Sequence, residues 1–327
     1  MSPDSQQDFA LAFLSILFEG APFILLGTLI SGFIDVYLPP GTMDRFLPRN
    51  RKSAVVVAGL LGAVFPVCEC AVVPVIRRLV GKGLPVSCAL TYMLAAPIVN
   101  PITALSTWKA FQGQGAGMMT CSRLLLGFLV AVAVGLIVMR LPLSAVLKKP
   151  LVDSLAEKDA KNAKESGCCG EHSHDHTHHA QAASAANDGD RLVAAFRSAM
   201  KDFVDVGVYF AIGVTITALF NTGIAPGANW LDGLAANQTA APAALMTLAF
   251  ILSLCSTSDA FIAATLDKFS WGAKLAFLTF GPMMDVKLLF LYQTVLRKRF
   301  IVFLAIGLFV AIGAITIFWQ HQIFQAR

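Results

Sequence analysis

The chain has 327 residues, of which 56 % are hydrophobic and 14 % are charged. Soluble proteins carry about 25 % charged residues, and at a mean hydropathy of +0.69 too few polar side chains remain to coat a water-soluble core. The composition therefore excludes a soluble protein and predicts an integral membrane protein. The net charge of +5 fits Lys and Arg at the bilayer surface, because no basic stripe with stacking aromatics indicates nucleic-acid binding.

Eight stretches of the chain approach the length of about 20 apolar residues that a helix needs to cross a bilayer. They cover residues 9–34, 54–76, 84–107, 118–139, 203–220, 241–266, 275–296 and 300–319. The predicted fold is an all-α integral membrane protein with about eight transmembrane segments. Seven Cys without a repeating disulfide spacing are expected to be free thiols.

A polar stretch, residues 142–200, separates two apolar halves of the chain. We expect a first transmembrane repeat (1–141), a Cys/His-rich linker (142–200) and a second transmembrane repeat (201–327). The linker has too little apolar content to fold as a domain. When sides alternate over eight spans, Lys and Arg are in excess on the linker's side. The positive-inside rule then predicts a multi-pass protein of the bacterial inner membrane with both termini and the linker in the cytoplasm.

The two halves repeat one another at three polar landmarks. Glu19 corresponds to Asp205, Cys68 to Cys255, and residues 96–100 to 281–285, with offsets of 186, 187 and 185 residues. Such constancy in apolar sequence indicates a duplicated unit with broken helices, as in secondary transporters whose site lies at the midplane. Parallel repeats follow from four spans in each half, and inverted repeats follow if one segment is a re-entrant hairpin; the sequence leaves both open.

Acidic residues inside the apolar stretches carry the strongest functional signal, because each costs about 2.5–3.5 kcal/mol at a helix centre. Five such residues must face a cavity, a cation or one another: Glu19, Glu69, Asp205, Asp259 and Asp285. Hydrogen-bonded packing is the alternative for some of them. Lys287, taken as the basic residue within a span, is expected to be a counter-ion to one of these carboxylates.

The most informative motif is the pair Cys68 and Cys70, separated by Glu69 and flanked by Pro66 and Pro74. Each proline removes a helical hydrogen bond, so the backbone between them is predicted to be distorted. On a regular helix the two thiols would point about 200° apart, whereas a broken segment lets them converge on one ion. Two thiolates favour Cu(I), Zn(II) or a thiophilic arsenical. Simple buried packing is the more economical interpretation for Cys88 and Cys121.

The second half offers Cys255 to Asp259 as the matching site, although a hydroxyl run can also satisfy a bent helix. Asn100 and Asp285 each follow a proline break and add oxygen ligands. Met283 and Met284 are expected to pack in the core more than to bind Cu(I). The predicted substrate pathway is therefore Cys68, Glu69, Cys70, Asn100, Cys255, Asp259, Asp285, Glu19 and Asp205.

The linker contains a Cys/His tract whose alternating histidines share one side of an extended chain. Such a tract binds Zn, Cu or Ni by composition. The predicted metal ligands are Cys168, Cys169, His172, His174, His176, His178 and His179 in the linker, with Cys68, Cys70 and Cys255 in the membrane. We expect the tract to collect or sense metal before export; a solvated tract without a transport role is the alternative.

These motifs resemble those of the bacterial predicted-permease family that contains the organoarsenical and the copper/zinc efflux permeases. The resemblance rests on residues 66–70 with Pro74, on 96–101, and on 255–259 with 281–285, and it covers nearly all of the membrane-embedded sequence. It implies that Cys68 and Cys70 contact the substrate. The Cys/His-rich linker resembles the copper/zinc branch. The second half lacks a matching Cys-x-Cys pair, so a symmetric site of two thiols from each repeat is not implied.

We therefore expect an efflux permease that exports Cu or Zn by alternating access, is not an enzyme, and requires no cofactor beyond its transported and linker-bound ions. No Walker A or P-type phosphorylation sequence appears, so ATP hydrolysis by this chain is not expected and the motor stays open; a carboxylate that exchanges a proton for the metal would suit antiport, with Glu69 as the candidate. The alternatives are a trivalent organoarsenical permease, a membrane thiol oxidoreductase and a metal sensor. The expected partners are metal ions and the lipid bilayer, not nucleic acid; the oligomeric state stays open.

Overall fold

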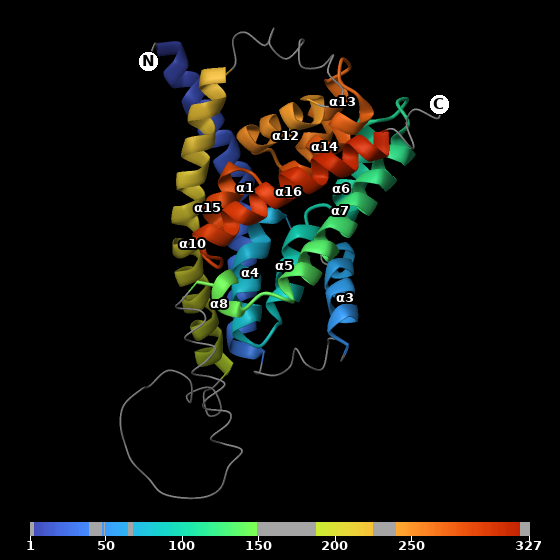
Figure 1. The fold of residues 1–327 in the computed structure, drawn as a ribbon. Helices are drawn as coiled ribbons and strands as arrows, with labels where there is room; N and C mark the ends of the chain where they lie inside the picture. The colour runs from blue at the N-terminus through green and yellow to red at the C-terminus, as the bar shows by residue number, and fades with distance from the viewer. Residues whose placement is uncertain are drawn as a thin grey trace, which may run out of the picture.

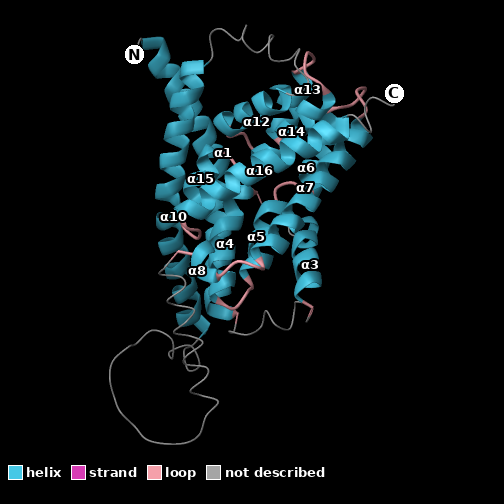
Figure 2. Ribbon diagram, in the orientation of Figure 1, coloured by secondary structure: helices cyan, strands magenta, loops and turns pink. Residues whose placement is uncertain are grey.

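The computed structural model describes residues 3–38, 48, 50–64, 68–148, 188–224 and 240–320, and within these ranges it contains helices and no strand (Figures 1 and 2). Five of its helical stretches are long and apolar enough to cross a membrane: Gln6–Tyr37, Ala116–Val138, Gly189–Leu219, Trp271–Tyr292 and Lys298–Trp319. Shorter apolar helices at Val86–Ala95 and Ala240–Leu252 accompany them. The predicted class, an all-α integral membrane protein, is confirmed.

Four of the eight predicted segments are interrupted helices. The helices of the first half are α1 (Pro3–Tyr37), α3 (Arg51–Val64), α4 (Glu69–Gly81), α5 (Val86–Ala95), α6 (Pro101–Ala110), α7 (Ala116–Val138) and α8 (Leu143–Val146). Those of the second half are α10 (Asp188–Ile224), α12 (Ala240–Leu252), α13 (Ser258–Thr265), α14 (Trp271–Met283), α15 (Val286–Tyr292) and α16 (Lys298–Trp319). Helix α10 thus begins before the predicted boundary at residue 201.

Equivalent polar residues begin a new helix in both halves. The side chain of Asn100 accepts a hydrogen bond from the backbone N–H of Ile102 at 2.9 Å and caps α6. The side chain of Asp285 accepts one from Leu288 at 2.6 Å and caps α15. Such caps satisfy donors that a helix beginning within the membrane would otherwise leave unpaired. The matching breaks support the duplication indicated by the sequence.

Helices α1 and α10 occupy equivalent places in the two halves and run antiparallel to one another. Gly20 of α1 approaches Phe210, whereas Ser31, further along α1, donates a hydrogen bond to Asp202 at 2.8 Å. In Figure 1, α1 descends beside α10 from the mark of the N-terminus. Because equivalent helices run in opposite directions, the repeats are inverted.

The second segment of the first half is a re-entrant hairpin. Helix α4 runs parallel to α1, since Gly27 lies beside Ala71 and Asp35 accepts a hydrogen bond from Lys82. Helix α3 runs parallel to α5, which turns back from α4, since Gly59 lies beside Thr91 and Gly62 lies beside Ala96. Helices α3 and α4 are therefore antiparallel and enter and leave at the same end. In Figure 1 the α12–α13 pair lies at the opposite end of the molecule.

The two ends of the bundle hold different parts of the chain. Figure 1 places the beginning of α1 and the end of α16 toward one end of the bundle, here called the terminal end. The short helix α8 and the beginning of α10 lie at the other, here called the linker end. The prediction puts both termini on the linker's side, whereas the described part of the chain begins α1 and ends α16 at the end of the bundle opposite to α8 and the beginning of α10. One re-entrant hairpin in each half would account for this arrangement.

The long helices present apolar side chains outward. Exposed large hydrophobic residues are spread along α1, α7, α10 and α16, for example Phe18, Leu129, Val208 and Val310. Helix α14 and the beginning of α15 are in contrast almost completely buried. An apolar outer surface is what a lipid environment selects, while the interior holds the polar groups.

Candidate functional site

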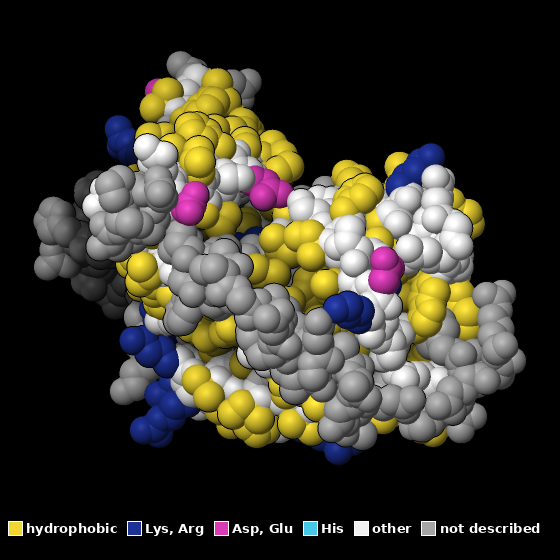
Figure 3. Space-filling model, turned by 90° about the horizontal axis from the view of Figure 1, so that it is seen from above, with side chains coloured by type: hydrophobic (Ala, Val, Ile, Leu, Met, Phe, Trp, Pro, Cys, Tyr) yellow, Lys and Arg dark blue, Asp and Glu magenta, His cyan; other side chains and the backbone are white. Residues whose placement is uncertain are grey.

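A pocket collects the thiols and carboxylates that the sequence singled out. It is lined by Glu19 of α1, by Cys68, Glu69 and Cys70 at the start of α4, by Cys255 and by Lys287 of α15. Apolar walls come from Ile16, Phe23 and Phe210. Figure 3, which views the molecule from the terminal end, shows a hollow with hydrophobic walls and acidic side chains at its rim.

The first half contributes the tip of its hairpin. Cys68 has an extended backbone (φ −73°, ψ 163°) and directly precedes α4, whereas Glu69 and Cys70 already lie in the first turn of the helix. Both cysteines are free and line the pocket. The predicted distortion does not reach Pro74, which lies within α4; residues 65–67 lie outside the described residues.

The second half contributes the break between α12 and α13. Ser253 is the one non-glycine residue with a left-handed backbone (φ 48°) in the described part of the chain. Its hydroxyl accepts a hydrogen bond from the backbone N–H of Val286 at 3.1 Å, which fixes the start of the break. Cys255 follows and lines the pocket, with the Thr257 hydroxyl 3.5 Å from its sulfur. Both repeats thus supply sulfur to one pocket.

Lys287 is the counter-ion that the sequence predicted, but it serves two carboxylates. Its Nζ lies 3.1 Å from Oε1 of Glu69 and 3.6 Å from Oδ2 of Asp285. All three side chains are nearly inaccessible to solvent. The second oxygen of Glu69, Oε2, is buried and has no hydrogen-bond partner. A buried ammonium between two carboxylates compensates charges that would otherwise be prohibitive in a membrane.

The remaining predicted pathway residues are divided between the pocket and other places. Glu19 lines the pocket and accepts a hydrogen bond from Ser258 at 3.3 Å. Asp259 forms an ion pair with Arg123 at 2.8 Å. Asp205 lies outside the pocket, where its half-exposed carboxylate pairs with Arg77 at 3.4 Å. Asn100 and Asp285 act as helix caps, and of the two only Asp285 also contacts a pocket residue, Lys287.

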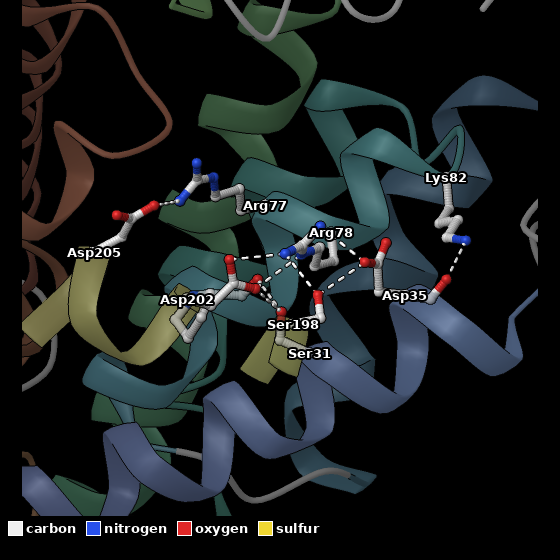
Figure 4. Close-up of polar contacts among 9 residues, drawn as sticks. Ser31, Asp35, Arg77, Arg78, Lys82, Ser198, Asp202 and Asp205 are labelled. Carbon is white, nitrogen blue, oxygen red and sulfur yellow. Dashed lines mark hydrogen bonds and ion pairs between the residues drawn. The ribbon is translucent and has the colours of Figure 1, made fainter. Parts of the chain in front are cut away.

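A polar network at the linker end was not recognised in the sequence. The guanidinium of Arg78 in α4 donates two hydrogen bonds to Asp202 of α10, at 2.8 and 2.9 Å, and lies 3.1 Å from Asp35 of α1 (Figure 4). Ser31 and Ser198 complete the network. Helices α1, α4 and α10 are thereby joined on the linker side of the pocket.

The sequence analysis also did not single out Arg123. It is a basic residue inside the predicted span 118–139, so Lys287 is not the one basic residue within the predicted spans. Its side chain is 1 % exposed and belongs to α7. The sequence does contain a signal for it: an arginine within an apolar stretch requires a carboxylate partner, just as a buried carboxylate requires a basic one.

The predicted metal ligands fall into two groups. Among the described residues, no group of three or more His, Cys, Asp or Glu side chains is arranged to hold a metal ion. The predicted ligands Cys168, Cys169, His172, His174, His176, His178 and His179 lie outside the described residues. Met283 and Met284 are buried in the core and do not line the pocket. Cys88 packs against α3, and Cys121 is exposed on α7.

Comparison with known proteins identifies the class. Residues 6–319 match the model of a family described as predicted permease, and the chain belongs to this family. UPF0718 protein YcgR of Bacillus subtilis strain 168 is 36 % identical over 301 residues, which are 92 % of each chain. A Streptococcus mutans protein, provisionally named as a two-component membrane permease complex subunit, is 31 % identical over 300 residues, which are 91 % of this chain and 90 % of that one. No solved structure matches.

The family confirms the coarser part of the sequence interpretation: the chain is a multi-pass membrane protein of a permease family. A non-enzymatic role agrees with this class.

Proposed function

We propose that this permease exports soft transition-metal ions, Cu or Zn, through the pocket between its two repeats. The observation that carries the proposal is that one pocket built from both halves is lined by three thiols, those of Cys68, Cys70 and Cys255. In the described state they do not form a three-ligand metal site, so the proposal requires them to converge when cargo binds. Thiolates select Cu(I) and Zn(II) over Mg and Ca. The Cys/His tract of the linker, a metal-binding composition, supports metal as the cargo.

The charges around the pocket favour sulfur as the primary ligand. Glu69 is paired with Lys287, which it shares with Asp285, so its carboxylate is already engaged by a cation of the protein. Glu19 is engaged by Ser258 at the pocket wall. The three sulfur atoms are therefore the pocket groups best suited to a thiophilic cargo. This arrangement also favours the second candidate, a trivalent organoarsenical, because arsenic bound by two or three thiolates needs no additional carboxylate.

Alternating access fits the inverted repeats, which place the pocket between two halves of opposite orientation. The pocket lies along residues 16–23 of α1, whereas the network of Arg78 joins α1, α4 and α10 further toward the linker end. The described state therefore has its helices tied together on the linker side of the pocket. Transport would require this network to separate when the pocket opens toward the linker end.

Basic residues also gather at the linker end, which supports placing that end in the cytoplasm of a bacterial inner membrane. They flank α3, α4, α7, α10 and α16, and include Arg51, Lys52, Arg77, Arg78, Lys82, Arg140, Lys148, Arg191, Arg197, Lys201, Arg297, Lys298 and Arg299. On this orientation the linker tract meets cytoplasmic metal before export, while α1 begins and α16 ends on the opposite side.

The proposal is tested with everted membrane vesicles from cells that express the chain. Uptake of zinc, copper(I) and methylarsenite is compared between the native chain and Cys68→Ser, with Cys88→Ser as the matched control, since Cys88 packs away from the pocket against α3. Uptake of a metal that is lost in Cys68→Ser and kept in Cys88→Ser supports the proposal. Uptake of methylarsenite alone would assign the second candidate. Equal uptake by Cys68→Ser and Cys88→Ser would contradict both the metal and the organoarsenical proposals.

A further inference from the structure

A buried guanidinium joins the two halves behind the pocket. In Arg123 of α7, Nη2 lies 2.8 Å from Oδ2 of Asp259 and donates to the backbone carbonyl of Ser256 at 3.0 Å. The other terminal nitrogen, Nη1, donates to the hydroxyl of Thr107 in α6 at 2.8 Å. A planar guanidinium with several fixed partners holds its surroundings in one geometry, which a flexible ammonium does less well.

The segment that Arg123 holds is the one that carries the Cys255 thiol. Ser256 follows Cys255 directly, and Asp259 lies in the first turn of α13. The beginning of the break is fixed separately, by the hydrogen bond between Ser253 and Val286. Cys255 therefore lies between two fixed points, Ser253 before it and the Ser256–Asp259 segment after it. The contacts that fix the segment after Cys255 come from Arg123, in the first half of the chain.

The first hairpin is held in a comparable way. Glu69, beside Cys68 and Cys70, pairs with Lys287 from the second half, and Asp259, beyond Cys255, pairs with Arg123 from the first half. Each pocket-bearing break is thus pinned by a basic residue of the other repeat. The two basic residues occupy different places in the repeat, since Lys287 belongs to α15 and Arg123 to α7. Lys287 lines the pocket, whereas Arg123 does not.

We propose that Arg123 is a positioning residue that holds the Cys255 segment in the pocket and thereby sets the affinity for cargo without touching it. This inference rests on the proposed function for its link to transport, but its structural part does not depend on the identity of the cargo. Residues that orient ligands from behind change metal affinity about 10- to 100-fold when they are altered.

The transport arm uses Arg123→Lys, which keeps the charge and loses the planar set of donors. The cargo concentration at half-maximal uptake is expected to rise about tenfold, while the maximal rate changes less. Arg140→Lys, at an exposed position just beyond the end of α7, is the matched control and is expected to behave as the native chain. A proportional loss of maximal rate with an unchanged half-maximal concentration would overturn the positioning role.

The labelling arm needs no cargo. In a chain whose one remaining cysteine is Cys255, Arg123→Lys is expected to change the rate of alkylation by a membrane-permeant maleimide severalfold. A chain retaining Cys88 alone serves as the control, because that buried thiol reports whether the fold is intact. If Arg123→Lys does not accumulate, Thr107→Val removes one partner of the guanidinium, keeps the ion pair, and should give a smaller change in the same direction.

An unchanged alkylation rate at Cys255 would overturn the inference whatever the transport data show. Failure of the native chain to transport zinc, copper or methylarsenite would instead refute the proposed function, and the labelling result would still decide the role of Arg123.

Discussion

Replacing Lys287 with Met should destabilise the protein more than any single change to its acidic partners. The substitution leaves Glu69 and Asp285, both almost fully buried, without the ammonium that lies 3.1 and 3.6 Å from them. Removing one partner of a buried ion pair costs about 3–5 kcal/mol. Glu69→Gln leaves Lys287 with Asp285, so its cost should be near that of one charged hydrogen bond, about 1.5–3 kcal/mol.

A triple variant separates the loss of charge balance from the loss of shape. Lys287→Met combined with Glu69→Gln and Asp285→Asn removes all three charges, and Asn can still cap α15. It should recover most of the stability that Lys287→Met loses, because replacing a whole buried ionic group is far less costly than leaving it half paired. The free energies of unfolding are measured by SDS titration in mixed micelles with circular dichroism. A Lys287→Met chain as stable as Glu69→Gln would refute the reasoning.

Three further predictions concern transport and topology. Deleting residues 168–179 should weaken export at low metal and leave it nearly intact at high metal; complete loss at all concentrations in vesicle uptake would show that the tract is essential machinery. Reporter proteins fused before α1 and within the linker should report opposite sides of the membrane, and equal signals would contradict the three-crossing repeats. If Glu69 exchanges a proton for the metal, Glu69→Gln should flatten the pH dependence of uptake; a fully retained pH profile would exclude that coupling.

The helix breaks could be predicted because their signals are local. Prolines and a capping side chain mark the start of α6 at Asn100 and of α15 at Asp285, and both appear in the sequence at matching positions. The re-entrant path of α3 and α4 could not be predicted in the same way. Residues 54–76 are apolar enough to cross a membrane, and the hairpin depends on tertiary contacts such as the close approach of Gly62 to Ala96.

The sequence pointed to several residues that line the pocket, the carboxylates through the cost of burying them and the thiols of Cys68 and Cys70 through their place between prolines. Carboxylates in apolar sequence must face something polar, and Glu19 and Glu69 line one pocket with Cys68, Cys70 and Cys255. Which carboxylate meets which cation is a tertiary property.

Asp205 and Asp259 illustrate that limit. They were assigned to the pathway on the same grounds, but Asp205 pairs with Arg77 and Asp259 with Arg123. Each of these partners lies far away in the sequence, so no local pattern connects them.

The central claim, that the pocket thiols bind the cargo, is tested most directly by X-ray absorption spectroscopy of the purified chain. The chain is prepared without residues 168–179, so that the linker tract contributes no ligands, and is loaded with copper(I) or zinc. Two to three sulfur neighbours are predicted around the bound ion, with one fewer in each of Cys68→Ser and Cys255→Ser and no change in Cys88→Ser. A bound ion surrounded by nitrogen and oxygen alone, or a sulfur count that is the same in all variants, would contradict the claim.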